Sequence, residues 1–161
     1  MEYLASHANA HHKKLVLNPA PAAAIPSSVY KRLFLITPNE TEAEILTGIE
    51  VTNEITAQQA VEFLKAKGVL NVIITMGSKG AYVSADGYQG MVETVKVKAI
   101  DTTAAGDVFN GALVLALSEN KPWKEAVEFA CKAAAISVTQ MGAQSSAPYR
   151  NQIDEQNKSF L

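Results

Sequence analysis

Two kinds of hydrophobic pattern alternate along the chain. Short continuous apolar runs predict buried β-strands, and apolar residues that recur every three or four positions predict amphipathic helices. The predicted strands cover residues 14–18, 33–37 and 71–77. The predicted helices cover residues 3–12, 40–48, 56–68, 107–118 and 123–139. Strands that alternate with helices in this way predict an α/β fold, with a largely parallel sheet covered on both faces.

Residues 80–97 depart from this pattern. Apolar and polar residues alternate there on both sides of Asp86-Gly87, a pair that favours a tight turn. This segment is therefore predicted to form a hairpin or a meander. The chain beyond residue 145 begins as a loop and is expected to end in a short helix.

Composition narrows the class of protein. With 161 residues, 48% of them hydrophobic, the chain is long enough for a single α/β domain over residues 1–161. A formal net charge of −2 provides no bulk attraction to nucleic acid or to an anionic membrane. The single cysteine, Cys131, cannot form an internal disulfide, and no apolar run approaches the ~20 residues that span a bilayer. We therefore expect a cytoplasmic protein with no nucleic-acid partner and no membrane partner.

Three loops are the candidates for chemistry. Parallel sheets bind ligands at the carboxyl ends of their strands, where loops lead into helices. The loops that follow predicted strands are "TPNETE" (37–42), "TMGSKG" (75–80) and "DTTAAGD" (101–107).

The last of these loops has the features of an anion site. Ala104, Ala105 and Gly106 are small, and the free N–H groups of the following helix would point out of its first turn. Asp107 could cap that helix, or it could act as a general base beside the bound anion. Small neighbours are unnecessary for a cap, so their presence favours the base.

Five motifs resemble the ribokinase-like family of carbohydrate kinases, and among its members the ribokinases. The motifs are "LNPAPA" (17–22), "TPNETEAEILTG" (37–48), "TMGSKGAYV" (75–83), "DTTAAGDVFNGAL" (101–113) and "GAQSSAP" (142–148). They occur in the order and at the spacing of that family. The family usually has glycine where Ala104 stands, although alanine is familiar there among ribokinases.

The resemblance implies a fold and an activity. The fold is a three-layer αβα, Rossmann-like arrangement with a mostly parallel sheet. The activity is the ATP-dependent phosphorylation of D-ribose at its 5-hydroxyl. Asp107 would be the catalytic base, and the N–H groups of Ala104, Ala105, Gly106 and Asp107 would form the anion hole for the γ-phosphate.

The resemblance also implies nucleotide-binding residues. Asn39 and Glu42 would organise Mg²⁺ through water, which suits an ion that retains several waters. Thr75 and Gly77 would contact ATP, and Gly80 would allow the turn beside it. Cys131 would border the adenine. The alternatives are that Glu42 only complements a helix N-terminus and that Cys131 is a small core residue.

A monovalent cation, usually K⁺, lies beside the anion hole in ribokinases. The residues that correspond to its ligands, mostly through backbone carbonyls, are Asp101, Thr103, Ser137, Gln140, Gly142 and Ser146. The alternative for Asp101 is a turn residue at the end of a strand.

The motifs match only the C-terminal half of a ribokinase. The first strands of the sheet, the sugar-binding residues and the small β lid have no counterpart in this sequence. We therefore expect weak activity from the chain alone, and either homo-oligomerisation or association through an exposed sheet edge. Two alternatives stay open: half of another sugar or nucleoside kinase, and a non-catalytic nucleotide-binding or assembly fragment.

Overall fold

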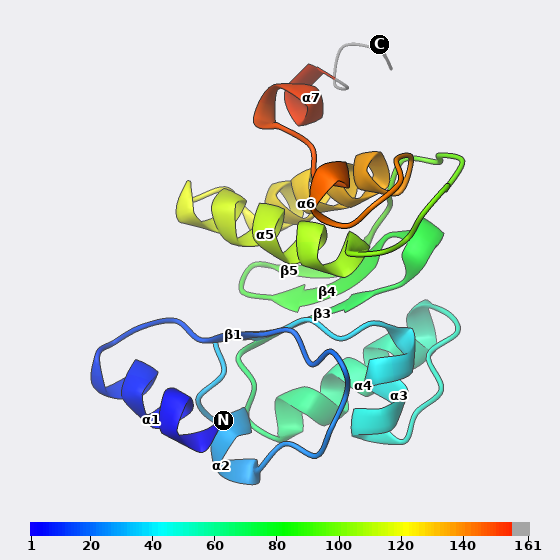
Figure 1. The fold of residues 1–161 in the computed structure, drawn as a ribbon. Coiled ribbons are helices and arrows are strands. Elements are labelled where there is room, and N and C mark those ends of the chain that lie inside the picture. Colours follow the sequence, from blue (N-terminus) through cyan, green and yellow to red (C-terminus); the bar gives the residue numbers. More distant parts are fainter. Residues whose placement is uncertain (156–161) are drawn as a thin grey trace. The chain divides into compact units, whose positions relative to one another are not determined.

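The computed structural model describes residues 1–155, and its elements follow the predicted alternation (Figure 1). The helices are α1 (Glu2–Ala10), α2 (Ser27–Tyr30), α3 (Glu40–Thr47), α4 (Glu54–Ala66), α5 (Ala105–Ser118), α6 (Trp123–Ser137) and α7 (Arg150–Glu155). The strands are β1 (Val16–Leu17), β2 (Leu35–Ile36), β3 (Asn71–Thr75), β4 (Ala81–Ala85) and β5 (Tyr88–Val92), and 3₁₀ turns cover Gly77–Lys79 and Gln144–Ser146. The expected α/β fold is confirmed. Helix α2 was not predicted, since its four residues are too few to show a helical period.

The strands form one mixed sheet in the order β1-β2-β3-β4-β5. Strands β1, β2 and β3 are parallel, with Leu35 opposite both Val16 and Asn71. Strand β4 is antiparallel to β3. Only residues 76–80 join β3 to β4, whereas a parallel connection needs about a dozen residues or more. The short connection between β3 and β4 therefore makes the sheet mixed, and the turn predicted at Asp86-Gly87 joins β4 to β5.

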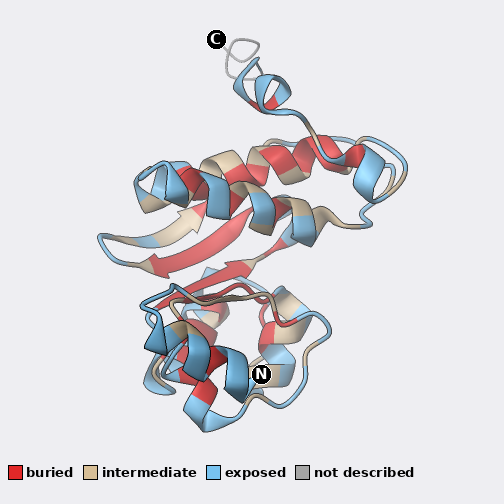
Figure 2. Ribbon diagram, turned by 60° about the vertical axis from the view of Figure 1, so that its left-hand side comes forward, coloured by how far each residue is buried: buried red, intermediate tan, exposed pale blue. Residues whose placement is uncertain are grey.

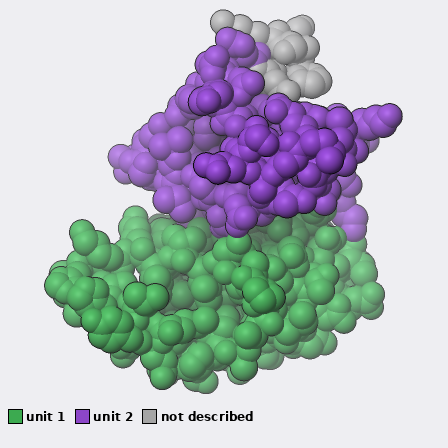
Figure 3. All heavy atoms as spheres, viewed as in Figure 1, with its two compact units in different colours: residues 1–77, 81–91 green, residues 78–80, 92–161 purple. Residues whose placement is uncertain are grey.

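The chain divides into two compact units, shown in separate colours in Figure 3. One unit contains residues 1–77 and 81–91, and the other contains residues 78–80 and the chain from Val92 onward. The two units are described individually below. That residues 1–161 act as a single domain stays a prediction.

The core of the first unit is built from β2, β3 and one face of α4. Ile36, Val72 and Ile74 are fully buried in this core. Helix α4 turns Ala57, Ala60, Val61 and Leu64 inward, at the spacing that predicted its apolar face. Buried residues are coloured red in Figure 2.

In the second unit, α5 and α6 pack against each other. Phe109, Leu113 and Ala116 form the buried stripe of α5. The facing side of α6 is rich in alanine, which lets two helices approach closely. Within residues 1–155, no helix has both the length and the apolar character needed to cross a membrane.

Candidate active site

The loop before α5 places Ala104, not Asp107, at the helix N-cap. Ala104 has φ 62° and ψ 8°, in the left-handed region, and the helix begins at Ala105. Asp107 therefore lies within the first turn and is not the N-cap, although its charge there still favours the helix N-terminus. The Asp107 carboxylate is therefore not used as the N-cap and could serve as a general base.

The first turn of α5 presents N–H groups beside this carboxylate. The N–H of Ala105 donates to the carbonyl of Thr102 at 3.2 Å, and the N–H of Val108 donates to the carbonyl of Ala104 at 2.9 Å. Gly106 and Asp107 lie between them, where an α-helix supplies no backbone acceptor. A carboxylate thus stands next to donors that favour an anion.

The left-handed conformation of Ala104 predicts a stabilising substitution. Alanine in this region costs about 1–2 kcal/mol, whereas glycine adopts it freely. Ala104→Gly is therefore expected to raise the free energy of unfolding by about 1 kcal/mol, as measured by denaturant titration. The matched substitution in the interior of the same helix, Ala112→Gly, is expected to lower it by about 0.5–1 kcal/mol. Destabilisation by both substitutions would contradict the prediction.

Hydrogen bonds of Asp101 connect the start of this loop to Gly142, which is 41 residues away in the sequence. Its Oδ1 accepts the N–H of Thr103 at 2.9 Å, and its Oδ2 accepts the N–H of Gly142 at 2.9 Å. The N–H groups of Ile100 and Asp101 both donate to the carbonyl of Val138, at 2.7 and 3.2 Å. The structure therefore brings together three of the six residues predicted to surround a cation: Asp101, Thr103 and Gly142.

The other three lie in the segment that leads from α6 toward α7. Ser137 and Ser146 are buried, and their hydroxyls donate to the carbonyls of Ala134 and Ala143 at 2.8 and 2.9 Å. The N–H of Gln140 donates to the carbonyl of Ser137 at 3.1 Å. The hydroxyl lone pairs and the carbonyl oxygens of this segment are the atoms that could contact a cation, and such contacts stay predictions.

The two hydrogen bonds of Asp101 predict a pH-dependent stability. Bonds from Thr103 and Gly142 hold the pKa of Asp101 below its ordinary value of 3.8. Since folding favours the ionised form, its contribution is complete above that value and disappears as the pH falls through the lower folded pKa. Asp101→Asn is therefore expected to lower the unfolding temperature at neutral pH, with a deficit that shrinks in acid. Thermal unfolding from about pH 2 to 7 measures the deficit, and a deficit independent of pH would contradict the prediction.

Asn39 and Glu42 form a capping box at the start of α3. The Glu42 N–H donates to Asn39 Oδ1, and the Asn39 N–H donates to Glu42 Oε2, each at 2.8 Å. The Thr75 N–H donates to the carbonyl of Pro38 at 3.0 Å, and Asn39 and Thr75 form a parallel β-bridge. These three predicted nucleotide residues are therefore neighbours. Glu42 therefore caps α3, and whether it also organises Mg²⁺ through water stays a prediction.

The turn after β3 contains the predicted glycines. Gly77 begins the 3₁₀ turn with φ 52°, and Gly80 ends the segment with φ 99°. Gly77 belongs to the first unit, with Asn39 and Glu42, and Gly80 belongs to the second, with Asp107. Their contacts with ATP stay predictions.

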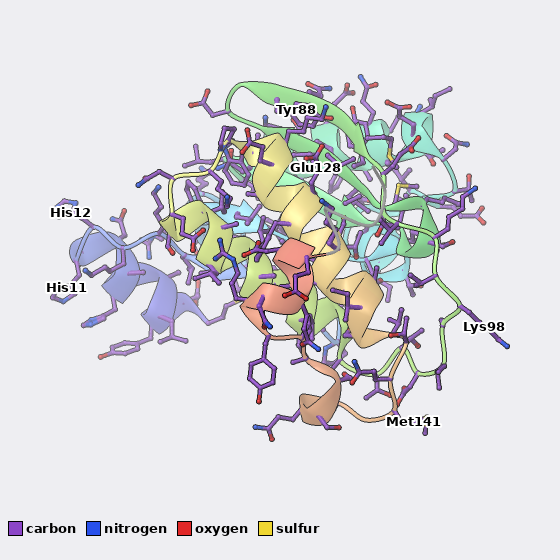
Figure 4. All side chains as sticks on the ribbon, turned by 90° about the horizontal axis from the view of Figure 1, so that it is seen from above. His11, His12, Tyr88, Lys98, Glu128 and Met141 are labelled. Carbon is purple, nitrogen blue, oxygen red and sulfur yellow. The ribbon has the colours of Figure 1, made fainter. Side chains whose placement is uncertain are left out.

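Cys131 lies on the buried face of α6 with 5% of its surface exposed. Burial and the nearby charge of Glu128, labelled in Figure 4, raise the pKa of its thiol to about 12. The alternative of a small core residue is therefore confirmed. A contact between Cys131 and adenine stays a prediction.

A cavity of about 530 Å³ lies beside Asp107 within the second unit. Its lining consists of Ala104, Asp107, Val108, Gly111, Ala112 and Leu115 of the α5 segment, Phe129 and Ala133 of α6, and Ala143, Gln144, Ala147, Pro148, Arg150 and Ile153 near α7. Apolar side chains predominate, with Asp107 and Arg150 as the two charged residues of this lining.

Sequence reasoning missed Arg150. Its guanidinium binds Glu119 through two bonds of 2.6 and 3.2 Å, binds Asp154 at 2.9 Å and lies 4.9 Å from the ring centre of Phe129. These contacts hold α7 against the end of α5 and against α6. The one local signal was the spacing of Arg150 and Asp154, which share a helix face.

Comparisons with known proteins identify the family of the chain. The model of the pfkB family carbohydrate kinases matches residues 1–150. A ribokinase from Haemophilus influenzae is 49% identical over 94% of this chain and 50% of its own length. The crystal structure of ribokinase from Thermotoga maritima is 43% identical, with a TM-score of 0.86 over 96% of this chain and 52% of that one.

A third relative is a structure of Arabidopsis thaliana ribokinase complexed with ribose and ATP. It is 28% identical, with a TM-score of 0.84 over 96% of this chain and 50% of that one. The chain thus spans about half the length of the relatives it matches. With the family model covering residues 1–150, the chain belongs to the pfkB family of carbohydrate kinases.

Proposed function

We propose that the chain is the nucleotide-binding and catalytic half of a ribokinase, which transfers the γ-phosphoryl group of ATP to the 5-hydroxyl of D-ribose. The observation that carries the proposal is the first turn of α5, where the Asp107 carboxylate lies beside N–H groups without helical acceptors. The ribokinases among the relatives support the choice of ribose.

The proposed chemistry follows from that turn. Asp107 accepts the proton of the sugar hydroxyl as its oxygen attacks the γ-phosphorus, and the bond to the β,γ-bridging oxygen of ATP breaks. The N–H groups of Gly106 and Asp107 donate to the transferred group as it passes from donor to acceptor. The products are ribose 5-phosphate and ADP.

Two cations complete the proposal. Glu42 Oε1 and Asn39, both at the N-terminus of α3, would hold Mg²⁺ through water, and the ion would neutralise phosphate charge. Oxygens around Asp101 and Gly142 would hold K⁺ beside the anion hole. The hydrogen bonds of Asp101 support a fixed geometry for that loop.

A second candidate is a fragment that binds nucleotide without turnover. The half-length match favours it, because residues that orient the sugar would lie in the half that residues 1–161 do not cover. Loss of such orientation removes up to ~7–11 kcal/mol of barrier reduction. A related sugar kinase is the third candidate, since a deoxyribokinase of Salmonella typhi is 38% identical.

One experiment separates these candidates. The chain is assayed for ADP release alone, and then after co-expression with the part of the Haemophilus influenzae ribokinase that it does not match. We expect little release alone and ribose-dependent release from the pair. Nucleotide binding by a folded pair without release would support the second candidate. Faster release with deoxyribose than with ribose would support the third, and full ribokinase activity from the chain alone would contradict the need for a second half.

A further inference from the structure

Helix α1 carries a stripe of ring side chains that the proposed function does not use. Tyr3, His7 and His11 follow one another at intervals of four residues, and residues four apart are neighbours on one face of a helix. All three are exposed, whereas Ala5 is the buried residue of α1. Packing in the core of the first unit therefore does not explain the stripe.

A different face of α1 holds the helix in the first unit. Ala5 belongs to the hydrophobic core of that unit. The hydroxyl of Ser28 donates to Glu2 Oε1 at 2.5 Å, and the guanidinium of Arg32 donates to the hydroxyl of Ser6. These contacts anchor α1 to α2 and to the residues that follow α2. The stripe is therefore displayed on a helix whose position is fixed from another side.

The two imidazoles of the stripe are close enough to share one metal ion. The ring centres of His7 and His11 are 4.3 Å apart, with 52° between the ring planes. Two nitrogens that each lie about 2.1 Å from one ion are about 3.0–3.4 Å apart. Rings this close can reach that separation by rotation about the broad χ2 torsion of histidine.

The surroundings of the two rings leave their nitrogens accessible. Tyr3 stacks on His7 with the ring centres 5.9 Å apart and 16° between the planes, which restricts the orientation of the His7 ring. Within residues 1–155, ring contacts are the side-chain interactions of His7 and His11, and neither imidazole is hydrogen-bonded to the protein. The ring nitrogens therefore face solvent and can accept a ligand.

The chemistry of these donors selects the kind of ion. Imidazole suits Zn²⁺, Cu²⁺ and Ni²⁺, whereas Mg²⁺ and Ca²⁺ prefer oxygen. Histidines at positions i and i+4 of a helix are also the zinc-binding pair of the H-E-x-x-H motif. The C-terminal end of a helix favours positive charge, and His11 is the C-cap of α1.

We propose that His7 and His11 form a two-histidine site for a divalent transition-metal ion, with Cu²⁺ bound more tightly than Zn²⁺ and water in the remaining positions. The order of the two ions follows the general order of divalent metal affinities. Water completes the site because no group of three or more metal-ligating side chains occurs within residues 1–155. The proposal is independent of the proposed function, because α1 supplies none of the residues assigned to ATP, Mg²⁺, K⁺ or the sugar.

The site is tested by calorimetric titration of the untagged chain with Cu²⁺ and then with Zn²⁺, in the absence of nucleotide. His7→Gln removes one ligand, and His12→Gln is the matched control. His12 is an exposed histidine beside His11, and both are labelled in Figure 4. The φ of His12 is 52°, in the left-handed region, so the chain leaves the helix there and His12 does not continue the stripe.

We expect the wild-type chain and His12→Gln to bind Cu²⁺ with the same affinity, and His7→Gln to bind it about tenfold or more weakly, since even the outer partners of metal ligands contribute about 10–100-fold. Electron paramagnetic resonance of the Cu²⁺ complex should show coupling to two imidazole nitrogens in the wild type and to one in His7→Gln. Circular dichroism verifies that each variant folds.

Three results would overturn the proposal. The first is the absence of Cu²⁺ binding by the folded wild-type chain. The second is equal affinity in all three proteins, which would place the ion elsewhere on the chain. The third is an equal loss in His7→Gln and His12→Gln, which would exclude the pair of His7 and His11 as the ligand set.

Discussion

Replacing Asp107 by asparagine is expected to lower kcat for ribose phosphorylation by ~10²–10⁴-fold in the pair formed with the complementary half. Asparagine has nearly the same shape as aspartate but cannot take the proton of the attacking hydroxyl. The backbone N–H groups of Gly106 and Asp107 are unchanged, so binding of the nucleotide phosphates should persist. The loss corresponds to about 3–5 kcal/mol of transition-state stabilisation. Initial rates of ADP release at saturating ribose and ATP measure it.

The control for this variant is Asp86→Asn, the same chemical change at an exposed aspartate in the turn between β4 and β5. It should leave kcat within a factor of about two, because surface substitutions usually have small effects. A calorimetric ATP titration of each variant pair separates lost chemistry from lost binding. If Asp107→Asn kept the wild-type kcat, Asp107 would not be the base.

The fold was predictable from sequence wherever a hydrophobic period was long enough to identify an element. Residues 56–68 and 107–118 have clear helical spacing, and α4 and α5 cover nearly the same ranges. The run 14–18 is reduced to Val16–Leu17, since pairing with β2 and not local pattern decides where a short strand ends. The turn at Asp86-Gly87 follows from its residues, but the antiparallel pairing of β4 with β3 depends on the short connection 76–80, which no hydrophobic period indicates.

The candidate site was predictable where it depends on local chemistry. Asn39 and Glu42 form the reciprocal cap that their three-residue spacing favours. The contact between Asp101 and Gly142 spans 41 residues, and no local pattern indicates it; the family motifs alone placed these residues in one site. The left-handed Ala104 was not predicted, because alanine usually favours the right-handed helix and the surrounding loop imposes this conformation.

Tertiary contacts outside the motifs were the least predictable. Arg150 binds Glu119 across 31 residues, and neither side chain has a local feature that indicates the other. Arg150 also lines the cavity beside Asp107. The cavity is also lined by Gly111 and Ala112, which lie on α5 beyond the loop whose small residues the sequence pattern singled out.

Replacing Gly80 by alanine is expected to destabilise the second unit by about 4 kcal/mol or more. Gly80 has φ 99°, a conformation that a side chain strains, and an added Cβ would overlap the carbonyl oxygen of Val92. The Cβ would also lie 2.9 Å from the Cα of Glu93 and 3.0 Å from its carbonyl carbon. These are all backbone atoms, so no side-chain rotation can relieve the overlap. Chemical denaturation of the isolated chain measures the loss.

The matched control is Gly87→Ala, in the turn between β4 and β5. Gly87 has φ 77°, but a Cβ there would meet nothing within 4 Å, so only the backbone strain of about 1–2 kcal/mol is expected. The difference between the two variants isolates the overlap with Val92 and Glu93. Equal losses would mean that conformation alone, and not the approach of the chain at residues 92–93, requires glycine at position 80. A larger loss for Gly80→Ala would show that this close approach fixes the turn between Thr75 and β4, the turn that the family resemblance assigns to the nucleotide.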